Sequence, residues 1–248
     1  MDKILVEICC GSAEDAVEAW HAGAKRIELN CDLFHGGLTP SIGSLLTVKA
    51  ETSLSVMAMV RPREGGFCYS DLEYRVMLYD ARAMLEAGAD GIVFGFLHSD
   101  GTLDTDRTAE FCRLAHSYGK QAVFHRAFDV VPEWKPAMDL LAAIGIDRIL
   151  TSGQEKEAYL ALDTLREMIA YAAGRIDILP GGGIKPNNIR RVISETGCSS
   201  VHLSLRKAVS DTSAVNAREI HFGGCIYPPE DRFMVSDRDC IHKLISEL

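Results

Sequence analysis

The chain has 248 residues, 47% of them hydrophobic and 25% charged, and its formal net charge is −9 at pH 7. These proportions are those of a folded globular protein and exclude a disordered one. The acidic balance disfavours nucleic acid and anionic membranes as partners. No apolar stretch approaches the roughly 18 uncharged residues of a membrane span, and no secretory leader precedes the first apolar run. We therefore expect a cytoplasmic protein with a single domain over residues 1–248.

Eight segments along the chain are predicted as β-strands, spaced about one strand–helix unit apart. In chain order they lie within residues 4–9, 22–29, 54–60, 87–94, 121–125, 144–151, 176–179 and 196–203. The second, fourth, sixth and eighth share a pattern in which a helix end and a glycine precede the strand. Glycine suits this position because a helix C-cap favours a positive φ, which a Cβ opposes.

Helical patterns fill the intervals between these strands. Ser12 followed by Asp15 is typical of a helix N-terminus, and Ser70 followed by Glu73 forms a capping box. After the capping box, apolar residues recur at helical spacing: Leu72, Val76, Tyr79, Ala83 and Ala87. Pro186 suits the first position of a later helix, and residues 237–248 are predicted as the last one.

Alternating strands and helices in about 250 residues predict an α/β fold, the single-domain (β/α)8 TIM barrel. An open, doubly wound sheet is the alternative. Residues 207–236 form a long connection before the last helix and are expected as a loop. This loop would either cap the mouth of the barrel or build a dimer contact.

Strand alternation places a group of polar side chains inside the barrel, near the C-terminal ends of the strands. The group comprises Glu7, Glu28, Asn30, Arg61, His125, Ser152, His202 and Ser204. A barrel interior is normally packed with branched apolar side chains, and burying this many polar groups costs several kcal/mol unless they pair with one another. Because TIM barrels carry their sites at this end, the group predicts a functional site.

Two acidic residues of the group suit acid–base chemistry. Glu7 and Glu28 are candidates for a general acid and base, or for acceptors of hydrogen bonds from a ligand. The alternative is that they form ion pairs with Arg61 and Arg126, which would make their burial tolerable. Both interpretations require the carboxylates to face the barrel axis.

A histidine and an aspartate extend the candidate catalytic set. His125 ends the fifth predicted strand, and Asp129 follows closely. A histidine beside a carboxylate at a strand end serves as a base or as a ligand. The alternative is a structural histidine whose hydrogen bonds are satisfied within the fold.

Arginine and glycine residues at the strand ends predict an anion site. Arg61 and Arg63 lie beside a glycine-rich loop and suit a carboxylate or a phosphate; the alternative is a loop anchored by Arg–Asp contacts. Late barrel loops can hold phosphate through backbone N–H groups, and the alternative for such a glycine run is a tight turn. The expected ligand-binding residues are Asn30, Arg61, Arg63, Arg126, Ser152, Gly181, Gly182, Gly183, His202 and Ser204.

Three cysteines at the ends of the first two strands are candidate metal ligands. Cys9, Cys10 and Cys31 lie on strands that are neighbours in a barrel. Thiolates there would suit a soft cation such as Cu(I). The alternative is that all three are buried, inert thiols.

The chain resembles the CutC family of copper homeostasis proteins over nearly its full length. The resemblance rests on Glu7-Ile-Cys-Cys10, Gly23-Ala-Lys-Arg-Ile-Glu-Leu29, Gly36-Gly-Leu-Thr-Pro-Ser41, Val60-Arg-Pro-Arg63, Cys68-Tyr-Ser-Asp71, Phe124-His-Arg-Ala-Phe-Asp129, Arg148-Ile-Leu-Thr-Ser-Gly153, Pro180-Gly-Gly-Gly183 and His202-x-Ser204. It implies a barrel fold, a cytoplasmic location, a homodimer and an association with copper tolerance and Cu(I) binding.

The resemblance also implies two thiol ligands, at the ends of the first and second strands. Cys9 matches the first position. The second position holds Asn30, and Cys31 comes one residue later. A shift of one residue along a strand turns a side chain to the opposite face, so Cys31 or Cys10 would need help from the loop to reach the site.

Two functions follow from these observations. The first is Cu(I) binding or handling at the barrel mouth, with a copper ion as the partner. The alternative is a barrel enzyme of the lyase, isomerase or hydrolase type, acting on a small anionic or phosphorylated metabolite. In that alternative, arginines and the glycine run hold the anion while Glu7, Glu28, His125 and Asp129 supply acid–base chemistry.

Overall fold

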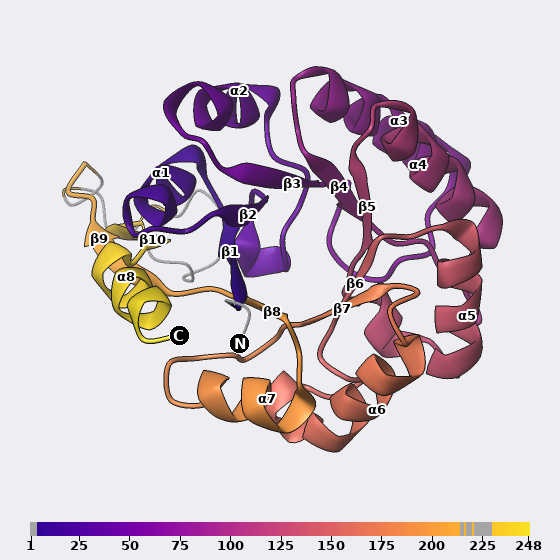
Figure 1. Ribbon diagram of the computed structural model, residues 1–248. Coiled ribbons are helices and arrows are strands. Elements are labelled where there is room, and N and C mark those ends of the chain that lie inside the picture. Colours follow the sequence, from indigo (N-terminus) through magenta and orange to yellow (C-terminus); the bar gives the residue numbers. More distant parts are fainter. Residues whose placement is uncertain (1–3, 214–215, 217–219, 221–229) are drawn as a thin grey trace.

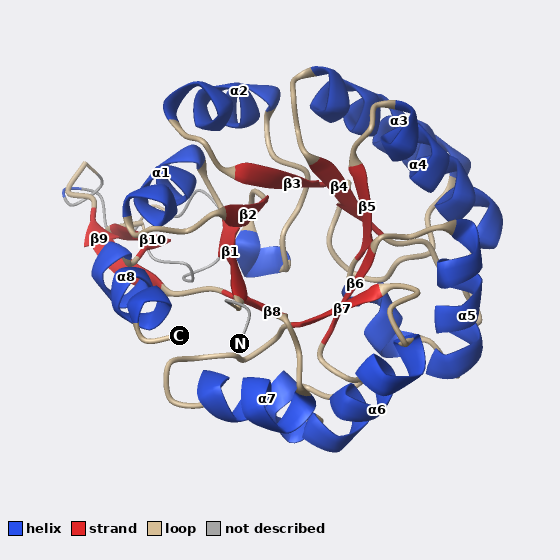
Figure 2. Ribbon diagram, viewed as in Figure 1, coloured by secondary structure: helices blue, strands red, loops and turns tan. Residues whose placement is uncertain are grey.

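Eight parallel strands form a ring at the centre of the molecule (Figures 1 and 2). The computed structural model describes residues 4–213, 216, 220 and 230–248. The strands are β1 (Leu5–Cys10), β2 (Arg26–Leu29), β3 (Ser55–Met59), β4 (Gly91–Phe94), β5 (Gln121–Phe124), β6 (Arg148–Thr151), β7 (Asp177–Pro180) and β8 (Ser200–Leu203). They follow the order of the chain, β1 pairs with β8, and a bridge from Gly181 to His202 closes the ring.

Helices surround the ring of strands, as Figure 2 shows. They are α1 (Ala13–His21), α2 (Ile42–Glu51), α3 (Asp71–Glu86), α4 (Thr105–Ser117), α5 (Trp134–Ile144), α6 (Leu162–Ala172), α7 (Ile189–Thr196) and α8 (Arg238–Ser246), with the 3-10 helices η1 (Leu33–His35), η2 (Arg126–Val130) and η3 (Ala158–Leu160). The prediction of a TIM barrel is confirmed. In the described part of the chain, no helix has the length and apolar character needed to cross a membrane.

The predicted helix starts are mostly confirmed. The Ser12 side chain accepts from the Asp15 backbone N–H, and both hydrogen bonds of the Ser70–Glu73 capping box are present. The prediction that Pro186 is the first residue of a helix is wrong, because α7 begins at Ile189. The Asn188 side chain accepts from Lys185 N and donates to the Gly183 carbonyl, so it closes a turn where the helix was expected to start.

Residues 207–236 are not entirely a loop. Two strands, β9 (Arg206–Ser210) and β10 (Arg232–Ser236), pair antiparallel as a separate sheet beside α1 and α8 (Figure 1). The side chain of Asp15, on α1, accepts from the backbone N–H groups of Gly11 at 2.8 Å and Ser236 at 2.5 Å. This buried carboxylate therefore joins β10 to the start of α1, a contact that the sequence did not predict.

The apolar stripe of α3 correctly predicts a helix, but most of the stripe faces outward. Leu72, Val76 and Tyr79 are 64%, 44% and 71% exposed. The face of α3 that packs on the barrel instead carries the buried residues Met77, Ala81, Met84 and Leu85. Helical spacing alone does not identify the buried face when a helix has apolar residues on two sides.

Inward and outward side chains of the strands form two distinct apolar regions. Met57, Met59, Val93 and Val123 pack together inside the ring, apart from the large cluster that lies between strands and helices. This inner group fills the middle of the barrel. The polar side chains that share the inward face must therefore gather beside it and towards the strand ends.

Asp15→Ala should lower the free energy of unfolding by about 3 kcal/mol, because it leaves two N–H groups, of Gly11 and Ser236, without their charged acceptor. Urea unfolding of the variant and the wild type measures the difference. Glu14→Ala, at the exposed neighbouring position, is the control and should change stability little. Equal stability of Asp15→Ala and wild type would contradict the role given to this carboxylate.

Candidate functional site

Glu7 lies at the centre of the inward polar group. Its Oε2 accepts from Arg26 Nε at 2.5 Å, and its Oε1 accepts from His202 Nδ1 at 2.8 Å. All three side chains are buried. The alternative that Glu7 pairs with Arg61 or Arg126 is wrong, because Arg26 on the adjacent strand already occupies the carboxylate.

Burial alone would raise the pKa of Glu7, yet the environment lowers it. The hydrogen bond from His202 and the positive charges of His202 and Arg26 bring the pKa of Glu7 down to about 2. Burial likewise opposes the charged form of His202, but the charge of Glu28 and the hydrogen bonds to Cys9 and Glu7 hold its pKa well above the ordinary value. The pair is therefore a carboxylate bonded to an imidazolium.

His202 also belongs to a second group, which it forms with Cys9 and Glu28. One ligand atom from each lies within 4.8 Å of the others. The Cys9 thiol is 3.7 Å from Glu28 Oε2, and His202 Nε2 is 3.9 Å from the same oxygen. We call these three residues the Cys9 cluster. Among the described residues, it is the one group of three His, Cys, Asp or Glu side chains whose ligand atoms are close enough to hold a metal ion.

Asn30 completes the surroundings of the Cys9 cluster. Its Nδ2 donates to Glu28 Oε2 at 2.9 Å and lies 3.6 Å from Cys9 Sγ. Burial, together with the charge of Glu28, raises the pKa of Cys9 to about 11, and burial also raises the pKa of Glu28. The thiol is therefore protonated at neutral pH and has a carboxylate beside it.

The other two candidate thiols lie outside the Cys9 cluster. Cys10 is fully buried on the outward face of β1, within the core between strands and helices, where its Sγ donates to the Ile8 carbonyl. The Cys31 thiol donates to the Thr39 carbonyl at 3.0 Å. The expected effect of a one-residue shift along the strand is thus seen for both residues.

His125 and Asp129 have partners of their own, away from Glu7 and Glu28. His125 Nδ1 accepts from Ala127 N as the N-cap of η2, and burial, followed by the charge of Arg61, lowers the pKa of His125 to about 3. Asp129 accepts from Arg126 Nε at 2.7 Å and from the backbone N–H and hydroxyl of Ser152. Asp129 therefore holds the loop after β6 against η2.

The two arginines after β3 bind loop atoms. Arg61 donates to the carbonyls of His35, Gly37 and Gly65, so it joins the loops that follow β2 and β3. Arg63 forms an ion pair with Glu73, and its guanidinium lies over the Tyr69 ring. Arg61 and Arg63 therefore bind carbonyl and glutamate groups instead of aspartates. The alternative of an Arg–Asp contact holds only at the end of the loop, where Asp71 binds Arg107 at 2.6 Å.

The glycine run after β7 lies against two parts of the predicted site. A Cβ on Gly181 would come within 2.6 Å of Leu150 and 3.1 Å of His202, so only glycine fits between these side chains. A Cβ on Gly182, whose φ is +96°, would lie 3.3 Å from Arg126 and from Ser152.

Ser204, just beyond β8, is exposed.

Sequence reasoning missed Arg26, although the signal was present. Arg26 shares the inward face of β2 with Glu28 and Asn30. It pairs with Glu7 and also donates to Gln121 at 2.9 Å. The same alternation could have identified Arg148, which bonds Asp177 at 2.6 Å near the opposite end of the barrel.

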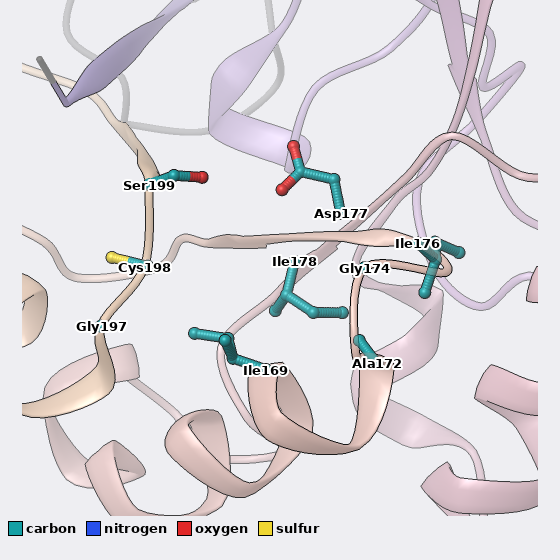
Figure 3. A pocket seen from close by; sticks show the side chains of 9 residues that line it. All are labelled: Ile169, Ala172, Gly174, Ile176, Asp177, Ile178, Gly197, Cys198 and Ser199. Atoms are coloured by element: carbon teal, nitrogen blue, oxygen red, sulfur yellow. The ribbon is translucent and has the colours of Figure 1, made fainter. Parts of the chain in front are cut away.

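A pocket of about 280 Å³ lies near Asp177 but away from the Cys9 cluster. Figure 3 shows Asp177 and Ser199 on its border with Ile169 and Ile178. Asp177 is the first residue of β7, whereas Cys9 is close to the end of β1. Because parallel strands begin at one end of a barrel, the pocket belongs to the N-terminal end and the Cys9 cluster to the C-terminal end.

Comparison with known proteins gives consistent matches. The model of the CutC family matches residues 4–207. A CutC family protein from Treponema denticola is 50% identical over 248 residues and 100% of both chains. The human copper homeostasis protein cutC homolog is 37% identical over 233 residues, which are 94% of this chain and 85% of that protein.

Solved structures show the same relationship. A copper homeostasis protein CutC from Streptococcus agalactiae superimposes with a TM-score of 0.75 and 34% identity, covering 80% of this chain and 97% of that one. A phosphoribosylanthranilate isomerase from Thermotoga maritima superimposes with a TM-score of 0.54 at 16% identity. The second similarity is one of fold alone.

Glu7→Gln should change the acid sensitivity of the protein. Folding lowers the pKa of Glu7 from 4.5 to about 2, so its ionised form stabilises the folded state above pH 4.5, and this contribution is lost as the pH falls towards 2. The lost contribution is on the order of 3 kcal/mol. Urea unfolding at a series of acidic pH values should show the free energy of unfolding falling with pH in the wild type and in the surface control Glu14→Gln. An equal fall in Glu7→Gln would exclude Glu7 as the source of this pH dependence.

Proposed function

Because the chain belongs to the CutC family, we propose that it binds copper as Cu(I) at the C-terminal mouth of the barrel and acts in copper homeostasis. The observation that carries the proposal is the Cys9 cluster, where a thiol, an imidazole and a carboxylate offer ligand atoms within 4.8 Å of one another. Relatives named as copper homeostasis proteins support the choice of metal.

The ligand atoms of the Cys9 cluster suit a soft cation. Thiolate sulfur is a preferred donor for Cu(I), and imidazole nitrogen also suits copper. We assign Cys9 Sγ and His202 Nε2 as the principal ligands. Cys9 is partly exposed while Glu28 and His202 are buried, so the thiol is the first of these groups that a copper ion would meet from the mouth.

Glu7 prepares His202 for this role. A ligating histidine commonly donates its second ring N–H to a carboxylate, which fixes the orientation of the ring. Here Nδ1 bonds to Glu7 and Nε2 is directed towards Glu28. Arg26 in turn holds Glu7, so the orientation of the imidazole depends on a pair of buried charges.

Glu28 provides an acceptor for the thiol proton. A metal-binding thiol must lose its proton, and the Cys9 thiol is directed at Glu28 Oε2. Cys9 would pass its proton to this carboxylate and His202 would release its Nε2 proton to the solvent at the mouth, so that Sγ and Nε2 become free to hold the metal. Asn30 keeps Glu28 in place for this transfer through its 2.9 Å hydrogen bond.

The alternative of a barrel enzyme is less well supported. Two of its four expected catalytic residues, His125 and Asp129, have structural partners instead of facing Glu7 and Glu28. The mouse and human relatives are named as copper homeostasis protein cutC homologs, and these names point to copper. The pairing of two copies stays a prediction of the family resemblance, and the cytoplasmic location stays a prediction of the sequence and of that resemblance.

Cys9→Ser should weaken Cu(I) binding by at least about 100-fold, since loss of an outer-shell partner alone costs about 10–100-fold. Anaerobic titration against a chromophoric Cu(I) chelator measures the affinity. Cys31→Ser is the matched control, because a hydroxyl can still donate to the Thr39 carbonyl and the residue lies outside the Cys9 cluster. Equal affinity in Cys9→Ser and wild type would overturn the proposed site.

Asn30→Cys should strengthen Cu(I) binding by about tenfold or more, because its thiol takes the place of Asn30 Cγ, one bond from the Nδ2 that lies 3.6 Å from Cys9 Sγ. The same chelator titration measures the gain. The double variant Cys9→Ser with Asn30→Cys tests whether the new thiol acts together with Cys9. A gain that persists without Cys9 would place the metal elsewhere.

A further inference from the structure

A second polar cluster lies on the β3–β5 side of the mouth, formed by Arg61, Tyr69 and His125. Each is less than a tenth exposed: 7%, 4% and 4%. In each, one polar atom lacks a hydrogen-bond partner among the described residues, namely Arg61 Nε, Tyr69 Oη and His125 Nε2. Buried polar groups are nearly always bonded, so three such atoms together indicate a missing acceptor.

Arg61 brings a buried positive charge without a carboxylate beside it. A guanidinium has five N–H donors, and three carbonyl oxygens account for part of them. None of its ion-pair or hydrogen-bond partners in the described part of the chain is acidic. The Nε–H edge is left over, and this edge is suited to an oxyanion.

His125 adds a second donor. Its Nδ1 accepts from the Ala127 backbone N–H, so the neutral ring carries its proton on Nε2. Burial and the charge of Arg61 lower the pKa of His125 to about 3, which keeps the ring neutral at physiological pH. Gly95 permits this position, because a Cβ there would lie 2.5 Å from the imidazole.

The Phe67 ring lies next to both Arg61 and His125. Its ring centroid is 4.8 Å from the His125 ring and 5.4 Å from Arg61 Cζ, so one aromatic side chain borders both groups. Burial raises the pKa of Tyr69, and the charge of Arg61 and its contact with the Tyr69 hydroxyl both oppose that rise. The hydroxyl is thus close to Arg61, and its own O–H has no acceptor among the described residues.

We propose that Arg61, His125 and Tyr69 form a binding site for an oxyanion group, a carboxylate or a phosphate, at the side of Phe67. Two N–H donors and a hydroxyl gather there without an acceptor, and an oxyanion supplies the acceptor atoms. The Cys9 cluster differs from this site in kind, because it joins ligand atoms of a thiol, an imidazole and a carboxylate. The proposal therefore does not depend on copper binding.

Tyr69→Phe is the sharpest test, because it removes only the unpartnered hydroxyl. Inorganic phosphate and acetate, titrated at constant ionic strength and followed by amide and imidazole NMR shifts, should each be tested for saturable binding. We expect saturation by at least one of them, a shift of the His125 Nε2–H resonance, and affinity about tenfold weaker in Tyr69→Phe. The probe that binds more tightly identifies the oxyanion as phosphate or carboxylate.

Three further variants distinguish binding at this site from binding elsewhere on the protein. His125→Asn keeps an acceptor for Ala127 N but removes the Nε2–H donor, and should also weaken binding of the oxyanion. Arg75→Gln removes a charge from the exposed side of α3, outside the site, and Cys9→Ser alters the Cys9 cluster; both should bind as the wild type does. Thermal unfolding of Tyr69→Phe should show no loss of stability. No saturation by either probe, or an equal loss in Arg75→Gln, would overturn the proposal.

Discussion

The buried contact between Glu7, Arg26 and His202 is the interaction on which the rest of the site depends. It joins β1 to β2 and to β8, the strands on either side of the first one. Removing charges from water is costly, and the cost is offset only when each charge has a partner at close range. Here a single carboxylate serves a guanidinium at 2.5 Å and an imidazole at 2.8 Å. The orientation of His202, and with it the position of Nε2 beside Cys9 and Glu28, follows from this arrangement.

The interior of the barrel carries polar groups on both sides of a small apolar layer. Met57, Met59, Val93 and Val123 form that layer. Nearer the N-terminal ends of the strands, Arg148 pairs with Asp177 and Arg26 reaches Gln121. Nearer the C-terminal ends lie Cys9 and Glu28. Arg26 therefore connects the two polar regions through Glu7, and its charge lowers the pKa of that carboxylate.

The alternation of strand and helix segments predicts the barrel. The alternation of side chains along each strand predicts the meeting of Glu7, Glu28, Asn30 and His202, because a period of two is fixed by the backbone. It did not predict the partners of Arg61, Arg126 and Asp129. These residues follow the strands, Arg61 in a loop and Arg126 and Asp129 in η2, and there carbonyl groups and hydroxyls compete with distant carboxylates for the same donors. Arg61 binds three loop carbonyls, and Arg126 binds Asp129, three residues further along the chain. Loop geometry decides such contacts, and sequence spacing does not encode it.

The hairpin of β9 and β10 and the late start of α7 were missed for a related reason. In each case a side chain bonds to backbone groups, Asp15 to Ser236 at the end of β10 and Asn188 to the turn before α7. Asp15 is separated from Ser236 by 221 positions, so no local pattern relates them. The apolar stripe of α3 shows a different limit of sequence reasoning. Its spacing correctly predicts a helix but does not reveal which side of the helix packs on the barrel.

The two polar clusters of the mouth meet at one glycine. The φ of Gly37 is +86°, and a Cβ there would lie 2.5 Å from Asn30 Oδ1, so the loop after β2 can approach Asn30 only with glycine at this position. The Gly37 carbonyl accepts from Arg61 Nη1 at 3.2 Å. Arg61 thus holds the loop that lies against Asn30, while its Nε edge is not used for this purpose. An oxyanion on that edge would leave the Gly37 contact intact, so the two sites can be occupied at the same time.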